Sequence, residues 1–194
     1  MSTFAAQKID EMSSIVFDKN VVEFVTVAAE YCAFIEQSGE KTQEEMIDVL
    51  PKLLSLLYLK VSMVPDTDMS QDVNLEEYVS ENDYEAVRQS ILTKLGGNDD
   101  YLEVFTEEMK YSDTPVRKCI SEDLADLYQA LKNFVESYKS GLNDIMTEAI
   151  AVCQDGFRSY WGQTLTNTLR AIHAIKYNQE DGLTDDDESM YMFK

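Results

Sequence analysis

The alternation of apolar and polar positions along the chain predicts a protein built from helices. In several separate stretches, apolar side chains recur every three or four residues, which places them on one face of an α-helix. These stretches cover residues 17–38, 42–64, 80–95 and 121–140, and a further one runs from 143 to 177. The pattern predicts an all-α fold, a single helical bundle of about five to seven helices.

Capping residues mark where these helices should begin and end. The predicted starts lie at Asp18, Thr42, Ser80, Ser121 and Asn143, and the predicted stops at Gly39, Pro65, Gly96 and Gly141. Thr42 and Glu45 have the spacing of a capping box, in which each side chain bonds to the backbone N–H of the other residue. Pro51 lies inside the second pattern, so this helix either bends there or restarts with Pro51 in its first turn.

The pattern from residue 143 to 177 changes phase at Gly156. The apolar face carries Met146 and Ala149 before the glycine and Trp161 and Leu165 after it, and the second face is rotated by about 100°. Either the helix kinks or breaks at the glycine, or it stays straight and packs against different neighbours along its length. The sequence leaves both open, and in both cases we expect Trp161 to be buried between helices.

A polar stripe with few charges lies opposite the second apolar face and consists of Gln163, Thr166, Asn167, Arg170 and His173. It is either a solvated surface or a pocket or partner surface that is partly buried and satisfied by hydrogen bonds. We expect Arg170 to hold a carboxylate or a buried polar group, because an unpaired arginine is costly to bury. The candidate ligand- or partner-binding residues are Arg158, Gln163, Asn167, Arg170 and His173.

Three segments lack a helical pattern. Residues 65–79 are a polar connection, residues 106–120 have the composition of a loop, and the segment from residue 178 is acidic. Low hydrophobicity and high charge prevent a segment from forming a core. We therefore predict a helical domain over residues 1–177 and a disordered acidic tail over residues 178–194.

The formal net charge of −21 makes some classes of binding partner unfavourable, and other features of the sequence indicate the compartment. A negative field of this kind repels nucleic-acid phosphates and anionic membranes and attracts basic proteins. No apolar run approaches the roughly 18 residues of a membrane span, and the first residues are charged where a signal peptide is apolar. Cys32 and Cys153 lie on apolar faces, which is typical of thiols in a reducing compartment. We expect a cytoplasmic protein with no nucleic-acid or membrane partner.

Residues that helical bundles use for catalysis or metal binding are scarce. A carboxylate-bridged di-metal site needs a Glu-x-x-His pair from each of two helices. The chain has one histidine, His173, and Arg170 stands three positions before it. A glycine-rich phosphate loop and the residue spacing of a calcium loop are also missing from the sequence. We expect no catalytic residues, no metal and no cofactor.

Two stretches resemble motifs of a known protein family. SEDLADLYQALKNFVESYK at 121–139 and FRSYWGQTLTNTLRAIHAI at 157–175 are similar to motifs of an uncharacterised helical family, a domain of unknown function from Bacteroides-type bacteria. LPKLLSLLYLKVSMVP at 50–65 resembles a third motif. The family's tryptophan-glycine pair matches Trp161-Gly162, and its Leu-Arg-Ala-x-His run matches Leu169 to His173. The family tends to have Gln-His after the glycine, whereas here Gln163 precedes Thr164. The resemblance implies a bacterial cytoplasmic helical protein and supplies no catalytic residues.

Two functional hypotheses of different classes follow. The first is a non-enzymatic, acidic protein-protein interaction or regulatory module, whose unidentified protein partner is basic if charge takes part in recognition. The alternative is a small-molecule or nucleotide-binding bundle that uses the polar stripe of the last helix. A weaker third hypothesis, nucleic-acid mimicry, depends on charge alone. The first two differ in whether the polar stripe faces solvent or a cavity, and the sequence indicates no oligomeric state.

Overall fold

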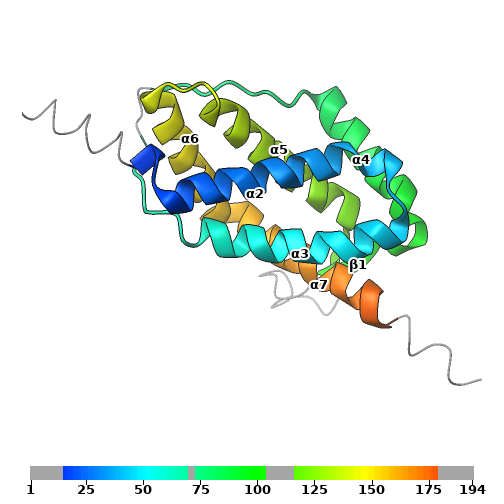
Figure 1. Cartoon of the computed structure of the whole chain (residues 1–194). Coiled ribbons are helices and arrows are strands. Elements are labelled where there is room, and N and C mark those ends of the chain that lie inside the picture. Colours follow the sequence, from blue (N-terminus) through cyan, green and yellow to red (C-terminus); the bar gives the residue numbers. More distant parts are fainter. Residues whose placement is uncertain (1–14, 70–72, 104–115, 179–194) are drawn as a thin grey trace, which may run out of the picture.

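The computed structural model of the chain describes residues 15–69, 73–103 and 116–178, which form a bundle of helices (Figure 1). The elements in chain order are α2 (Lys19–Glu36), the 3-10 turn η1 (Ser38–Glu40), α3 (Gln43–Val61), α4 (Glu81–Leu95), the 3-10 turn η2 (Gly96–Asn98), β1 (Asp100–Glu103), β2 (Val116–Cys119), α5 (Ile120–Tyr138), α6 (Asn143–Gly156), the π-helical turn η4 (Phe157–Trp161) and α7 (Gly162–Asn178). The predicted all-α bundle is confirmed. Of the predicted tail at 178–194, only Asn178 lies within the described residues, as the last residue of α7.

Helix α5 is the centre of the bundle. It packs against α2, α4, α6 and α7, and Figure 1 shows it crossing behind α2. Its apolar stripe is buried as the sequence predicts, and small or polar residues outside the stripe, including Ser121, Ala125 and Ser137, are buried as well. A helix with neighbours on several sides buries more than the one face that its amphipathic pattern indicates.

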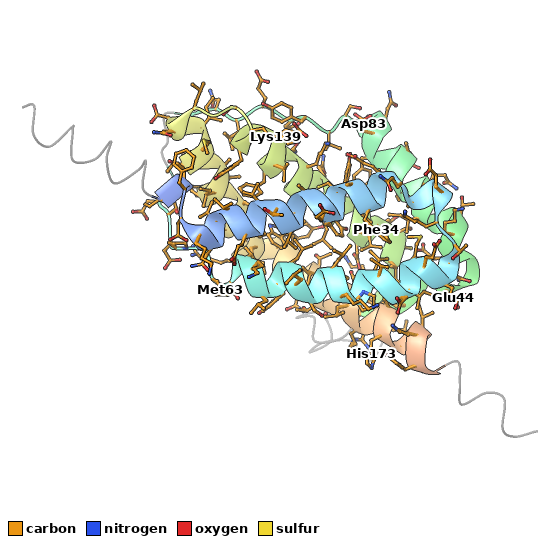
Figure 2. The ribbon with its side chains drawn as sticks, in the orientation of Figure 1. Phe34, Glu44, Met63, Asp83, Lys139 and His173 are labelled. Carbon is orange, nitrogen blue, oxygen red and sulfur yellow. The ribbon has the colours of Figure 1, made fainter. Side chains whose placement is uncertain are left out.

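Helices α2 and α3 lie side by side across one side of the molecule (Figure 1). Figure 2 shows their side chains filling the space between the two ribbons. The Phe24 ring of α2 stacks on the Phe134 ring of α5, with ring centroids 5.1 Å apart. The hydroxyl of Tyr31, also on α2, donates to the carbonyl oxygen of Leu124 at 2.8 Å. These contacts join the outer pair of helices to the central one.

The predicted helix starts are confirmed where the cap is local. Asp18 accepts from the Asn20 amide, and Thr42 forms the predicted capping box with Glu45. The start of α5 differs from the prediction, because the capping group comes from another segment. The carboxylate of Asp99 accepts from both the amide and the hydroxyl of Ser121, each at 2.8 Å. The predicted cap Asn143 is instead the first residue of α6.

Pro51 neither ends nor restarts the second helix. α3 runs through it from Gln43 to Val61. Proline lacks the amide that would bond to the carbonyl four residues before it, so one hydrogen bond of the helix is missing there. The helix continues because one face stays apolar on both sides of the proline, with Met46 and Leu50 before it and Leu54 after it, all fully buried.

A small antiparallel sheet is the element that the sequence did not predict. β1 and β2 pair in register from Asp100 opposite Cys119 to Glu103 opposite Val116. Residues 116–119 therefore form a strand, where a loop was predicted for 106–120. Four-residue strands are too short for a clear alternation of apolar and polar positions. Their pairing depends on hydrogen bonds between residues far apart in sequence, which a local pattern does not reveal.

The phase change at Gly156 is explained by the π-helical turn η4. α6, η4 and α7 follow one another without a break, and the Gly162 amide bonds back to the Phe157 carbonyl, five residues earlier. A π turn holds one residue more than an α turn, so it rotates the faces that follow by about 100°. This is the rotation seen in the sequence. The helix neither stops at Gly156 nor stays purely α-helical.

Candidate functional site

Three residues of the polar stripe hold strand β1 against helix α7. The side-chain amide of Asn167 donates to the Glu103 carboxylate at 3.0 Å, and Gln163 donates to the Asn167 side-chain oxygen at 2.9 Å. One turn further along, Arg170 donates to the carbonyl oxygen of Leu102 at 2.8 Å. Arg170 therefore has a polar partner, but this partner is the exposed backbone carbonyl of Leu102 and not the predicted carboxylate or buried polar group, and the Arg170 side chain is itself exposed. The polar groups of Gln163, Asn167 and Arg170 therefore already form hydrogen bonds within the protein.

The other two candidate residues lie elsewhere. Arg158, on η4, forms an exposed ion pair with Asp66. His173 is exposed on the outer side of α7, with its ring centroid 4.6 Å from that of Tyr177 (Figure 2). The structure thus brings Gln163, Asn167 and Arg170 together and leaves Arg158 and His173 apart from them.

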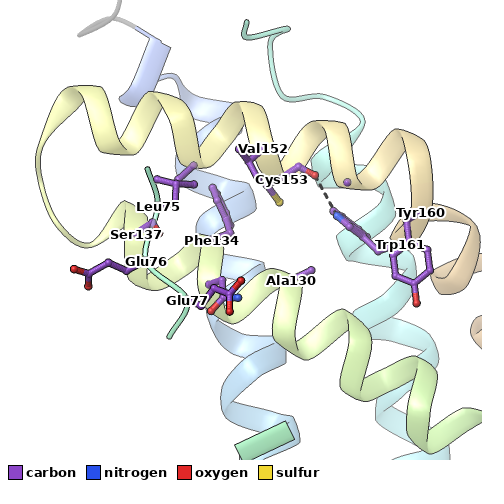
Figure 3. A pocket seen from close by; sticks show the side chains of 13 residues that line it. Leu75, Glu76, Glu77, Ala130, Phe134, Ser137, Val152, Cys153, Tyr160 and Trp161 are labelled. Carbon is purple, nitrogen blue, oxygen red and sulfur yellow. Dashed lines mark hydrogen bonds between the residues drawn. The ribbon is translucent and has the colours of Figure 1, made fainter. Parts of the chain in front are cut away.

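A groove of about 360 Å³ opens between α5 and the α6–η4 junction, beside Trp161. Figure 3 shows Ala130 and Phe134 of α5 on one side of it and Val152, Cys153 and Trp161 on the other. The extended segment 73–79 passes over the groove and lines it with Leu75, Glu76 and Glu77. The floor is therefore apolar and the rim is acidic.

Small residues line the groove where α5 meets α6, and they leave space between the two helices. Ala130, Ala149 and Gly156 all line it, and none of them has a side chain that reaches across. Trp161 is 1 % exposed and is held in place by its indole N–H, which donates to the Cys153 carbonyl at 3.1 Å. A Cβ added at Gly156 would lie 3.1 Å from the Trp161 ring. The glycine therefore gives the tryptophan its place at the end of the groove.

Asn133 of α5 holds segment 73–79 over the groove by hydrogen bonds to its backbone. The side-chain oxygen of Asn133 accepts from the amides of Tyr78 and Val79, at 2.7 and 3.1 Å. Val79 is buried, whereas Glu76 and Glu77 are exposed. Within the described residues, neither glutamate forms an ion pair or a hydrogen bond. Their charges are therefore available to a partner.

An acidic hollow of about 550 Å³ adjoins the groove and shares Glu77 with it. Asp126 lies in the hollow and accepts from Tyr84 at 2.8 Å and from Tyr160 of the groove. Burial, and then the bond to Asp126, raises the pKa of both tyrosines well above the ordinary phenol value. Both hydroxyls therefore stay protonated and act as donors. Glu81 adds another carboxylate to the wall of the hollow.

A buried carboxylate, Asp123, lies one turn of α5 away from Asp126. It is 4 % exposed and accepts from the Tyr101 hydroxyl of β1 at 2.5 Å and the Thr168 hydroxyl of α7 at 3.1 Å. Burial raises the pKa of this carboxyl to about 6. Asp123 therefore joins α5, β1 and α7, and burial disfavours its charged form.

The thiols have no sign of activation. Burial raises the pKa of Cys32 to about 12 and that of Cys153 well above its usual range. Both therefore stay protonated at neutral pH and are weak nucleophiles. Within residues 15–69, 73–103 and 116–178, no group of three or more His, Cys, Asp or Glu side chains could hold a metal ion. In the same residues, no helix is both long and apolar enough to cross a membrane.

The residues of the groove and the hollow were not singled out from the sequence. Trp161 was predicted as a core residue, which it is, and Tyr160 and Asp126 carry no local signal of their own. Glu76 and Glu77 belong to the polar connection predicted for 65–79, and Asn133 of α5 holds its last residues, Tyr78 and Val79. Two glutamates next to an aromatic residue, in the sequence LEEYV, are the one signal that could have indicated this rim.

Comparison with known proteins gives a family and a related structure. The sequence profile of a domain of unknown function, DUF5063, matches residues 15–178. A crystal structure of protein BF1032 from Bacteroides fragilis is 45 % identical in sequence, with a TM-score of 0.75. The alignment covers 84 % of this chain and 96 % of that one. No curated protein matches. The family indicated by the Trp161-Gly162 and Leu169–His173 motifs is thus confirmed, and the chain belongs to the bacterial DUF5063 family.

Proposed function

We propose that the protein is a non-enzymatic, cytoplasmic interaction module that binds a basic partner protein at the groove beside Trp161. The observation that carries the proposal is the combination of an apolar floor with an acidic rim. Val152 is 43 % exposed and Tyr160 54 % exposed, and both line the groove together with Glu76 and Glu77. Exposed apolar surface that is rimmed by polar groups is typical of a protein-binding site.

The apolar floor and the acidic rim of the groove contribute to binding in different ways. Removal of apolar surface from water supplies affinity. The carboxylates, in a chain of net charge −21, attract basic partners and repel acidic ones, which affects association rate and specificity more than affinity. The free cysteines Cys32, Cys119 and Cys153 support the cytoplasmic location, since thiols persist in reducing compartments.

The alternative function, a small-molecule or nucleotide site on the polar stripe, has less support. Asn167 and Arg170 already bond to Glu103 and to the Leu102 carbonyl, so a ligand would have to replace these contacts. Arg158 is paired with Asp66. A phosphate would also approach against the net negative charge of the chain.

Photo-crosslinking in the cells that naturally make the protein tests the proposal. A photoreactive phenylalanine analogue replaces Val152 in one version and Val22 of α2 in the other. The two valines are 43 % and 44 % exposed, and of the two only Val152 lines the groove. We expect a defined partner protein to crosslink at position 152 and not at position 22. Equal crosslinking at both positions, or none to any protein at position 152, contradicts the proposal.

A further inference from the structure

We propose that the groove and the acidic hollow form one docking surface for a basic amphipathic segment of the partner. An apolar side chain of this segment enters the groove beside Trp161, and a neighbouring lysine or arginine occupies the hollow at Glu77, Glu81 and Asp126. The inference depends on the proposed function and adds the chemistry of the partner segment to it.

The apolar half of the surface is the groove itself. Its floor combines the exposed Val152 with the small side chains of Ala130 and Ala149, which leave space next to the Trp161 ring. A side chain that enters this space buries apolar area on both molecules. A purely basic segment without an apolar residue leaves the floor in contact with water.

The charged half of the surface is the hollow. Three carboxylates line it, those of Glu77, Glu81 and Asp126, together with Tyr78 and Tyr84. Within the described residues no lysine or arginine forms an ion pair with any of these carboxylates. A cation attracted to carboxylates is also attracted to the faces of tyrosine rings. Charge complementarity therefore selects a basic occupant, and it disfavours a second copy of this acidic chain or an anionic lipid.

The connection between the two halves constrains the order of residues in the partner. Glu77 lines both the groove and the hollow. Tyr160 of the groove also bonds to Asp126 of the hollow. The apolar and basic residues of the partner must therefore lie close together in one segment, and each alone fills only half of the surface.

Three synthetic peptides and the fluorescence of the full-length protein test this inference. Trp161 is the only tryptophan and lies at the groove, so its emission reports occupancy. One peptide alternates leucine and lysine clusters in an amphipathic pattern, the second replaces each lysine by glutamate, and the third replaces each leucine by glutamine. We expect only the leucine–lysine peptide to shift the emission, with an affinity that falls about tenfold as salt rises from about 0.05 to 0.5 M.

Two variants and a matched control test the contributions of the hollow and the groove separately. Glu77→Gln combined with Glu81→Gln should weaken the leucine–lysine peptide about tenfold at low salt. The control pair, Glu30→Gln with Glu44→Gln, removes the same charge elsewhere, including another acid in the first turn of a helix, and should change the affinity less than twofold. Ala130→Leu fills the groove and should abolish the shift in emission. Circular dichroism verifies that each variant is folded.

Several results would overturn the inference. Equal binding of the lysine–glutamine peptide would mean that charge acts without the groove, and equal loss in both glutamate pairs would mean that the hollow has no special role. A Trp161 emission that changes with protein concentration alone would assign the groove to a second copy of the chain. If a partner protein crosslinks at position 152 while the peptides fail, the proposed function stands and this inference falls. If no partner protein crosslinks at position 152 and the peptides also fail to bind, both the proposed function and this inference are wrong.

Discussion

At the scale of single residues, Trp161 combines the largest fully buried side chain with a place at the groove. Its indole bonds to the Cys153 carbonyl, and its ring lies 4.8 Å from that of Phe157, measured between centroids. Trp161→Ala should lower the free energy of unfolding by about 3–5 kcal/mol, because it removes buried area and leaves a cavity. Urea unfolding measures the loss. Tyr177→Ala, at an exposed ring, should cost less than about 1 kcal/mol, and similar losses in the two variants would contradict this account.

Asp123 gives the protein a predicted dependence of stability on pH. Its pKa is raised to about 6 in the folded state, against about 3.9 in an unfolded chain. The carboxyl therefore favours folding fully below about pH 4, and this contribution is lost as the pH rises through 6. Relative to Asp123→Asn, the free energy of unfolding of the natural protein should fall by about 1–3 kcal/mol between pH 4 and pH 7. Denaturant unfolding at several pH values measures this difference, and a difference that stays constant would contradict the prediction.

At the scale of elements, the π turn η4 decides which side chains face the groove. Gly162 makes the turn possible, since a Cβ there would lie 2.4 Å from the Phe157 carbonyl oxygen. Gly162→Ala should destabilise the protein by about 1–3 kcal/mol through this clash. Gly97→Ala is the control, because nothing lies within 4 Å of a Cβ at that position. Thermal unfolding of both variants tests the prediction, which fails if Gly162→Ala melts like the natural protein.

Segment 73–79 depends on Asn133 for its place over the groove. Asn133→Ala removes the acceptor for the Tyr78 and Val79 amides, so these amides should exchange with deuterium at least about tenfold faster, which corresponds to about 1.4 kcal/mol. Asn133→Asp keeps an acceptor oxygen and should retain most of the protection. Unchanged exchange in Asn133→Ala would mean that other contacts hold the segment.

At the scale of the whole molecule, net charge should control the rate of association with a basic partner. The sequence after Tyr177 contributes six acids and one lysine. Ending the chain at Tyr177 should slow association with the leucine–lysine peptide at low salt and leave the rate at high salt nearly unchanged, because the Debye length shrinks from about 10 Å at 0.1 M to about 3 Å at 1 M. Stopped-flow measurements at both salt concentrations test this. A rate that ignores both salt and truncation would exclude charge from recognition.

Local signals in the sequence determined the helices and most of their ends. The periodicity of the apolar positions predicted each long helix, because one buried face requires that spacing whatever lies opposite. The boxes at Thr42–Glu45 and Ser80–Asp83 formed because both partners are three residues apart. The burial of Trp161 followed from the apolar face that it shares with Leu165. The π turn was also visible in the sequence, as a rotation of the apolar face by about 100° at Gly156, although the sequence alone did not identify its cause.

Contacts between segments that are distant in sequence determined the cap of α5, the small sheet, the partners of the polar stripe and the groove. The Asp99 carboxylate caps α5 from 22 residues away, and the pairing of β1 with β2 joins residues that are 13 to 19 positions apart. The polar stripe forms hydrogen bonds within the protein because β1 lies against α7. The groove is left where the small side chains of Ala130 and Ala149 line the junction of α5 and α6 beside segment 73–79. A residue's local pattern sets which side of its helix is buried. The neighbour that covers that side, and the gap that remains, depend on how all the helices pack at once, and only the tertiary structure determines this.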